Sequence, residues 1–270
     1  MFCRKSVEER EIIMESEKIF TGLARQFEGT FIEELIPGML HNFANPLNGI
    51  MGRSKLLQKR AQDALPMLID RNEDRDLIEE IYGKILRDID LISQESDRFY
   101  NLFNDVAAKI HRLHNKNSQS INISELIESE IAFFDFYLDF KHKVEKDLAL
   151  NRDIPLLEGT PSDYSMAMST IIRHAMKSMD TCDVRRLSIS TECDLDYIYV
   201  TFQDTGEHAD ASVIADFCRS LDFDSLGGPH LNGSLNLISA MALLKKYDAR
   251  FNAEVDEGCF RFSVIIPYKR

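Results

Sequence analysis

The stretch of sequence that decides the fold is IEEIYGKILRDIDLISQESDRFYNLFNDVAAKIHRL, residues 78–113. Apolar side chains recur in it every seven residues, and others fill a second position of the repeat. A repeat of this length, kept over about five heptads, is typical of a long helix that packs along another helix. The seven-residue series is Ile78, Ile85, Ile92, Phe99, Val106 and Leu113, and the further seam positions are Ile81, Ile89, Phe103 and Ile110.

The preceding segment predicts the partner of this helix. Residues 6–114 have a helical pattern with one interruption at 61–74, around Pro66, so a long helical hairpin is expected. The first arm has its own apolar stripe, and two such arms expose more apolar surface than one hairpin can bury. A dimeric four-helix bundle resolves this excess. The alternative is a monomeric hairpin folded onto the second domain of its own chain. The stripe of the first arm is Ile19, Phe20, Leu23, Phe27, Phe31, Leu35, Met39, Phe43 and Leu47.

The remainder of the chain has a different pattern. Residues 115–122 (NKNSQSIN) are polar and predict a linker. The helices and mostly antiparallel strands that follow favour a two-layer α/β sandwich. The sequence thus predicts a helical dimerisation domain over 1–114, the linker over 115–122 and an α/β domain over 123–270. The predicted helices lie near 123–138, 161–179 and 233–247, and the strands near 142–150, 185–193, 196–203, 249–256 and 259–267.

Composition excludes several classes of protein. Lys and Arg total 32 against 45 for Asp and Glu, and the net charge of −13 argues against a nucleic-acid partner. No window approaches about eighteen consecutive apolar residues, so neither a membrane span nor a signal peptide is expected. The five cysteines lack paired spacing, which favours reduced thiols over disulfides or a zinc site. A cytoplasmic protein without a metal site is therefore expected.

The first group of residues suited to chemistry is HNFANPLNGI, residues 41–50, in the first arm. His41 and Asn45 are four residues apart and therefore share one helix face. Pro46 follows them, and a proline in a helix interior costs about 3 kcal/mol, so its presence calls for a reason. A neutral imidazole has one nucleophilic nitrogen while a neighbour orients the other, which suits His41 to nucleophilic chemistry.

These residues resemble the H-box of sensor histidine kinases, in which the phosphoacceptor histidine is followed by an acidic residue, by Asn or Thr at the fourth place, and by Pro-Leu. The resemblance implies that His41 is the phosphoacceptor and that Asn45 positions a water or phosphoryl group. Asn42 stands in place of the usual acidic base, and an amide cannot take a proton from imidazole. Autophosphorylation should therefore be weakened, whereas transfer between His41 and an aspartate of a partner makes no such demand.

Residues 123–270 resemble the GHKL-type ATP-binding domain of the same kinases. The sequence DTG at 204–206 is similar to the D-x-G-x-G box, whose aspartate accepts a hydrogen bond from the adenine amine. This resemblance makes Asp204 and Gly206 candidates for nucleotide binding, together with His174 in the N-box, Lys177 near the phosphates and Gly233 in the G-T-G-L-G-L box. Lys177 equally fits an ordinary solvated lysine on a helix.

Several positions depart from the nucleotide-binding pattern. His174 replaces the family asparagine that holds Mg²⁺, and imidazole is a poorer magnesium ligand than a hard oxygen. Side chains at 234 and 236 replace glycines whose backbone amides would cradle phosphate. ATP and Mg²⁺, the cofactors that the resemblance implies, are therefore not expected to bind well. The six departures are Asn42, Thr170, His174, His208, Ser234 and Asn236.

Three functional hypotheses follow. The first is a kinase-like histidine phosphotransferase, in which His41 on a homodimeric bundle exchanges phosphate with the receiver domain of a response regulator. The second is an ATP-dependent histidine autokinase that tolerates the replacements, and the third is a non-catalytic dimeric scaffold. No sensor segment is recognisable before His41, so we expect the signal to come from an upstream sensor or kinase, or through the N-terminal helix itself.

Overall fold

The computed structural model describes residues 17–29, 35–69, 75–208, 211–220, 235–256 and 258–269. The chain divides into two compact units. Residues 34–107 form one, the hairpin unit, and residues 1–33 together with 108–270 form the other, the α/β unit. The long helix α3 (Arg75–His114) belongs to both, because its residues from Ala108 onward are part of the α/β unit.

The hairpin unit consists of α2 (Ile36–Ile69) and the greater part of α3, which confirms the predicted helical hairpin. Phe43 of α2 packs edge to face on Phe99 of α3, with 5.4 Å between the ring centroids. Gly49 permits a close approach of the two helices, because a Cβ at this position would lie only 3.1 Å from Cγ of Glu95.

A buried carboxylate links the two helices of the hairpin unit. Asp88 of α3 is 1% exposed and lies between two arginines of α2 that are seven residues apart. Nη1 of Arg53 is 3.4 Å from Oδ1 of Asp88, and Arg60 donates a short hydrogen bond to Oδ2. A buried charge is costly unless it is paired, so this position of α3 is satisfied only when it faces this part of α2.

The predicted interruption at 61–74 was wrong over most of its length. Helix α2 continues through Pro66 to Ile69, and only residues 70–74 lie outside the described residues. Proline removes a single backbone donor, and Pro66 stands only three residues before the last residue of the helix. The residues before it include Ala61, Gln62 and Ala64, which favour helix and offset that loss.

The apolar stripe that the sequence predicts for the first arm is divided between the two units. Residues 17–29 form a separate helix that belongs to the α/β unit, and residues 6–16 and 30–34 of the predicted arm lie outside the described residues. In that helix Leu23 is buried, and the Phe27 ring lies 6.1 Å from the Phe133 ring. Nζ of Lys109 lies 5.4 Å from the centroid of the Phe27 ring. The apolar residues of this helix are therefore used inside the α/β unit.

The α/β unit is built on a five-stranded sheet, which confirms the predicted α/β sandwich. The strand order is β2-β4-β5-β7-β6, with β2 parallel to β4 and the other pairs antiparallel. The strands are β2 (Glu145–Leu150), β4 (Arg186–Cys193), β5 (Tyr197–Asp204), β6 (Arg250–Asp256) and β7 (Cys259–Pro267).

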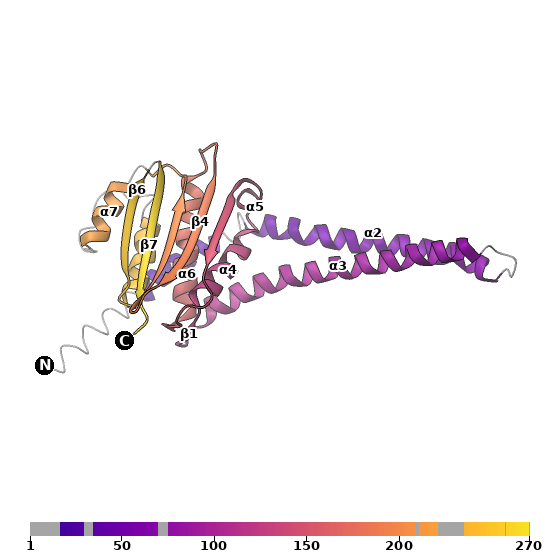
Figure 1. Ribbon diagram of the computed structural model, residues 1–270, viewed down its shortest axis with the longest axis horizontal. Helices are drawn as coiled ribbons and strands as arrows, with labels where there is room; N and C mark the ends of the chain where they lie inside the picture. Colours follow the sequence, from indigo (N-terminus) through magenta and orange to yellow (C-terminus); the bar gives the residue numbers. More distant parts are fainter. Residues whose placement is uncertain are drawn as a thin grey trace. The chain divides into compact units, whose positions relative to one another are not determined.

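Helices cover one face of this sheet, as Figure 1 shows. Alternate residues of β5 and β7 are buried and the others are only partly covered, the pattern of a sheet with one packed face. Besides the helix over 17–29 and the end of α3, the described part of the unit contains α4 (Ile123–Phe134), α5 (Leu138–Lys143), α6 (Pro161–Ser178), α7 (Ala211–Ser220) and α8 (Leu235–Lys245).

The segment predicted as a linker contains a strand. β1 (Gln119–Ile121) pairs antiparallel with β3 (Leu157–Gly159), and Ile121 is buried opposite Leu157. The polar composition of residues 115–122 hid this, because a three-residue strand needs only one buried side chain. Among the described residues, no helix combines the length and the apolar character that a membrane crossing requires.

Candidate functional site

The first candidate group lies on α2, where His41 and Asn45 are both exposed one helical turn apart. Pro46, the next residue, is buried, so its ring packs inside the unit while the helix continues past it. His41 is thus held on a regular helix with its ring open to solvent. Such a ring can be approached by a partner without any rearrangement of the backbone.

Asn42, in place of the usual acidic residue, is 4% exposed. Neighbouring helical positions point about 100° apart, and here this difference separates a buried amide from an exposed imidazole. The Asn42 side chain is therefore buried, and solvent and partners reach His41 and Asn45 instead.

The second candidate group gathers around Asp204, the last residue of β5, which is 2% exposed. Its Oδ1 accepts hydrogen bonds from the backbone N of Gly206 at 2.8 Å and from Nε2 of His208 at 2.8 Å. The hydroxyl of Ser178, at the end of α6, lies 3.0 Å from the same oxygen. One oxygen of the carboxylate thus accepts two hydrogen bonds and lies within reach of the Ser178 hydroxyl, whose single proton can also go to the carbonyl oxygen of Ala175 at 2.8 Å.

The His208 ring has polar neighbours at its edge and an aromatic neighbour on one face. It stacks on Phe260 of β7 with 3.9 Å between centroids, and its Nδ1 lies 3.2 Å from Nε2 of His174 on α6. An ionised carboxylate only accepts, so Nε2 of His208 is the donor to Asp204. In the neutral tautomer, Nδ1 then accepts the proton of His174.

Of three other positions singled out in the sequence, two take no part in this cluster and one cannot be placed. The Lys177 side chain is exposed, and Gly233 lies outside the described residues. The hydroxyl of Thr170 donates to the carbonyl of Met166 in its own helix at 2.7 Å. The described residues contain no group of three or more His, Cys, Asp or Glu side chains able to hold a metal ion.

These observations test whether the residues present fit ATP and Mg²⁺. Asp204, which would accept the adenine amine, already receives His208 on Oδ1. His174, where the family has a magnesium ligand, is hydrogen-bonded to His208 and supplies no hard oxygen. In the described part of the chain these residues therefore do not fit the nucleotide and its metal ion.

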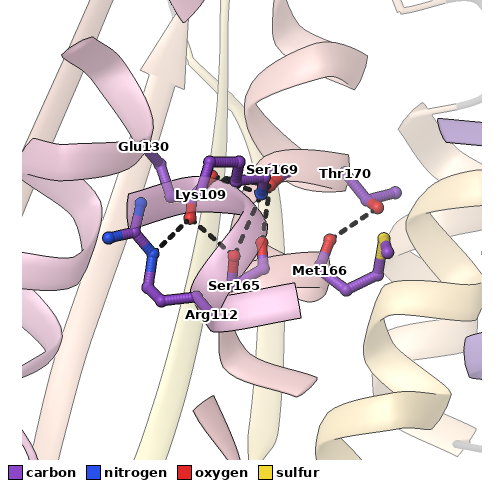
Figure 2. A network of polar contacts seen from close by, with 7 residues as sticks. All are labelled: Lys109, Arg112, Glu130, Ser165, Met166, Ser169 and Thr170. Carbon is purple, nitrogen blue, oxygen red and sulfur yellow. Dashed lines mark hydrogen bonds and ion pairs between the residues drawn. The ribbon is translucent and has the colours of Figure 1, made fainter. Parts of the chain in front are cut away.

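A buried ion pair that sequence reasoning missed joins α3, α4 and α6 within the α/β unit (Figure 2). Lys109 is 1% exposed and Glu130 is 0% exposed, and Nζ lies 2.6 Å from Oε2. Ser165 Oγ lies 2.6 Å from Oε1 of Glu130 and 3.0 Å from Nζ of Lys109, and Ser169 also donates to Glu130. Nε of Arg112 lies 3.4 Å from Oε1 of Glu130.

The charges of this network set the protonation of Glu130. Burial by itself would raise the pKa of Glu130, but the positive charges of Lys109 and Arg112, with hydrogen bonds from Lys109 and Ser165, hold the pKa below its ordinary value. Burial lowers the pKa of Lys109, and the charge of Glu130 opposes this shift. Lys109 and Glu130 are almost completely buried and only the Arg112 side chain is partly exposed, so the ion pair has a structural role.

Gly206 is required by packing. A Cβ at this position would lie 2.0 Å from Oγ and 2.6 Å from Cβ of Ser178. We expect Gly206→Ala to lower the free energy of unfolding by about 1–3 kcal/mol, because the loop must move away from α6. Gly52→Ala is the matched control, since nothing lies within 4 Å of its added Cβ and alanine favours helix. Urea unfolding measures both, and an unchanged G206A would contradict this close packing.

Comparisons with known proteins concern the backbone arrangement. No protein-family model matches the sequence, and no curated protein is significantly similar to it. The chain is similar to the catalytic domain of histidine kinase ThkA, with a TM-score of 0.46 and 15% identity over 56% of this chain and 96% of that one. It is similar to histidine kinase AdeS of Acinetobacter baumannii (TM-score 0.43, 14% identity, 81% and 96% covered) and to a mycobacterial sensor histidine kinase, MprB (0.43, 13%, 56% and 97%). These likenesses to histidine kinase cores assign no activity to this chain.

Proposed function

We propose that this chain works in two-component signalling and exchanges a phosphoryl group between His41 and the aspartate of a receiver domain. The observation that carries the proposal is the exposed pair of His41 and Asn45 on a regular helix of the hairpin unit. In the forward step, a neutral ring nitrogen of His41 attacks the phosphorus of the partner's phosphoaspartate. A nitrogen–phosphorus bond forms, the phosphorus–oxygen bond breaks, and the aspartate leaves as a carboxylate.

The neighbours of His41 support transfer from a partner over transfer from ATP. Asn45, one turn away, offers an amide donor that can hold a phosphoryl oxygen. Asn42 is buried and, being an amide, supplies no base for a direct attack on ATP. The receiver domain brings its own acceptor carboxylate and metal ion, so the chain needs only an accessible imidazole.

The surface of α3 supports a homodimer. Besides the residues that face α2, this helix has a second stripe whose large members are 3, 4, 7 or 11 residues apart, spacings that keep them on one helix face. Its large members are exposed, and α2 has an exposed apolar stripe of its own. Exposed stripes on both helices are best covered by a second copy in a four-helix bundle. The stripe residues are Tyr82, Leu86, Ile89, Tyr100, Phe103 and Ile110 on α3, and Leu40, Leu47 and Met51 on α2.

The function is tested by incubating the purified protein with labelled, phosphorylated receiver domains. We expect acid-labile label to reach the wild-type protein and to be lost completely from His41→Gln, because no other nitrogen takes its place. His111→Gln is the matched control, since His111 is also an exposed helical histidine. Transfer to H41Q equal to that of the wild type would overturn the proposal.

A second arm of the experiment separates the alternatives. Label that appears on His41 from γ-labelled ATP without a receiver domain would support the autokinase. A cellular phenotype that survives H41Q in folded protein would support the scaffold.

A further inference from the structure

The His208 side chain is buried although it belongs to a loop and carries polar groups. Its side chain is 2% exposed. Both ring nitrogens and one face of the ring have partners. Asp204 accepts from one ring nitrogen at 2.8 Å, and His174 faces the other nitrogen at 3.2 Å. The Phe260 ring covers one flat face, with planes inclined by 25°.

These partners form the set that recognises a flat heterocycle. A buried carboxylate accepts a hydrogen bond from an N–H group at the edge of the heterocycle, and an aromatic side chain stacks on its face. On the opposite edge, a donor can form a hydrogen bond to an unprotonated ring nitrogen. All three are fixed by regular structure. Asp204 ends β5, Phe260 stands directly opposite it on β7, and His174 belongs to α6. The framework therefore exists independently of the residue that fills it.

We propose that His208 is an intrachain ligand, whose imidazole fills a pocket suited to a flat heterocycle with an N–H donor and thereby keeps purine bases out. The loop that presents it is fastened at each preceding residue. The backbone N–H of Thr205 donates to the carbonyl oxygen of Arg186 at 3.2 Å. The backbone N–H of Gly206 donates to the Asp204 carboxylate, and the backbone N–H of Glu207 donates to the carbonyl oxygen of Ser178 at 3.1 Å. This occupant does not depend on the role proposed for His41.

The test removes the imidazole and offers it back in solution. We expect His208→Gly to have a lowered melting temperature, and imidazole at ten times its dissociation constant to raise that temperature by roughly 3–6 °C. The same concentration of 1-methylimidazole at pH 8 is expected to have no effect, because its neutral ring has no N–H for Asp204. Should H208G not fold alone, recovery of folded protein by refolding with imidazole, and not with 1-methylimidazole, is the same test.

Adenosine distinguishes the proposed role of His208, which is to exclude purine bases, from that of an ordinary core histidine. It carries a purine base without phosphates, so its binding reports on recognition of the base alone. We expect adenosine to stabilise H208G and to leave the wild type unchanged. Equal binding of adenosine to both proteins, or a folded H208G that responds neither to imidazole nor to adenosine, would overturn the proposal. A response of H208G to imidazole alone would overturn the statement that His208 is what excludes purines.

Discussion

Replacing Lys109 with methionine is expected to lower the free energy of unfolding by about 3–5 kcal/mol, because the carboxylate of Glu130 would remain buried without its main counter-charge. Glu130 is completely buried, and of its described polar partners Arg112 and the hydroxyls of Ser165 and Ser169 would remain. Methionine keeps most of the length of the lysine side chain, so the loss reports the charge and not a cavity. Urea unfolding at neutral pH measures the difference.

Two further variants give this result its meaning. Lys143→Met removes an exposed ion pair with Asp139, 2.9 Å long, and is expected to change stability by less than about 0.5 kcal/mol. The double variant K109M/E130L removes both charges and should regain much of the loss, as buried pairs replaced by apolar residues usually do. A K109M protein as stable as K143M would show that the pair does not stabilise the fold.

In acid, the difference in the free energy of unfolding between K109M and the wild type should become smaller. In the wild type the pKa of Glu130 lies below the ordinary 4.5, so its contribution is complete above that value and is lost as the pH falls through the lowered pKa. In K109M burial would raise the pKa of the same carboxyl, which then takes up a proton and ceases to be an unpaired charge. The wild type should therefore lose stability in acid over a range in which K109M loses less.

Ile89→Glu combined with Phe103→Glu is expected to convert the proposed dimer into a monomer. Both side chains are exposed on the second stripe of α3, two heptads apart, and the bundle would bury four new carboxylates between two copies. Burial of unpaired charge costs several kcal/mol, and each 1.4 kcal/mol is tenfold, so the dissociation constant should rise by at least about a hundredfold. Analytical ultracentrifugation over a dilution series measures it.

The control for this prediction adds the same charges elsewhere. Gln94→Glu with Asn101→Glu places two carboxylates on exposed positions of α3 away from the stripe and should leave the dimer intact. If the wild type were already a monomer at high concentration, or if I89E/F103E remained a dimer, the stripe would not be the dimer interface. Helical content by circular dichroism confirms that the variants are folded.

The sequence predicted those features that repeat along the chain. The heptads of α3 and the alternating residues of β5 and β7 each sum a weak preference over many positions, so the hairpin and the sandwich could be expected. In short elements, too few positions contribute for such weak preferences to add up to a clear pattern. Strands β1 and β3 have three residues each, and α5 has six, and none of the three was predicted.

The buried ion pair shows the other limit of the sequence. Lys109 lies three residues after Val106 of the seven-residue series, and the local pattern does not distinguish it from an ordinary exposed lysine. Its partner Glu130 lies 21 residues further along, in another helix. Only the fold brings them together, and the same is true of Asp204, His174 and Phe260. The candidate residues could be named from local motifs, whereas the hydrogen bond between His208 and Asp204 could not be predicted from them.

The position of Asp88 between Arg53 and Arg60 bears on how a signal could travel through the hairpin unit. Regular heptads allow one helix to slide past the other by a whole repeat, about 10 Å, and still bury apolar residues. Here such a slip would take one arginine out of reach of Asp88 and would put a larger side chain than Gly49 against Glu95. Longitudinal sliding is thereby penalised, whereas rotation of a helix about its own axis by a few degrees is not. If His41 has the proposed function, a signal that reaches it is therefore transmitted more easily by rotation of a helix than by its longitudinal sliding.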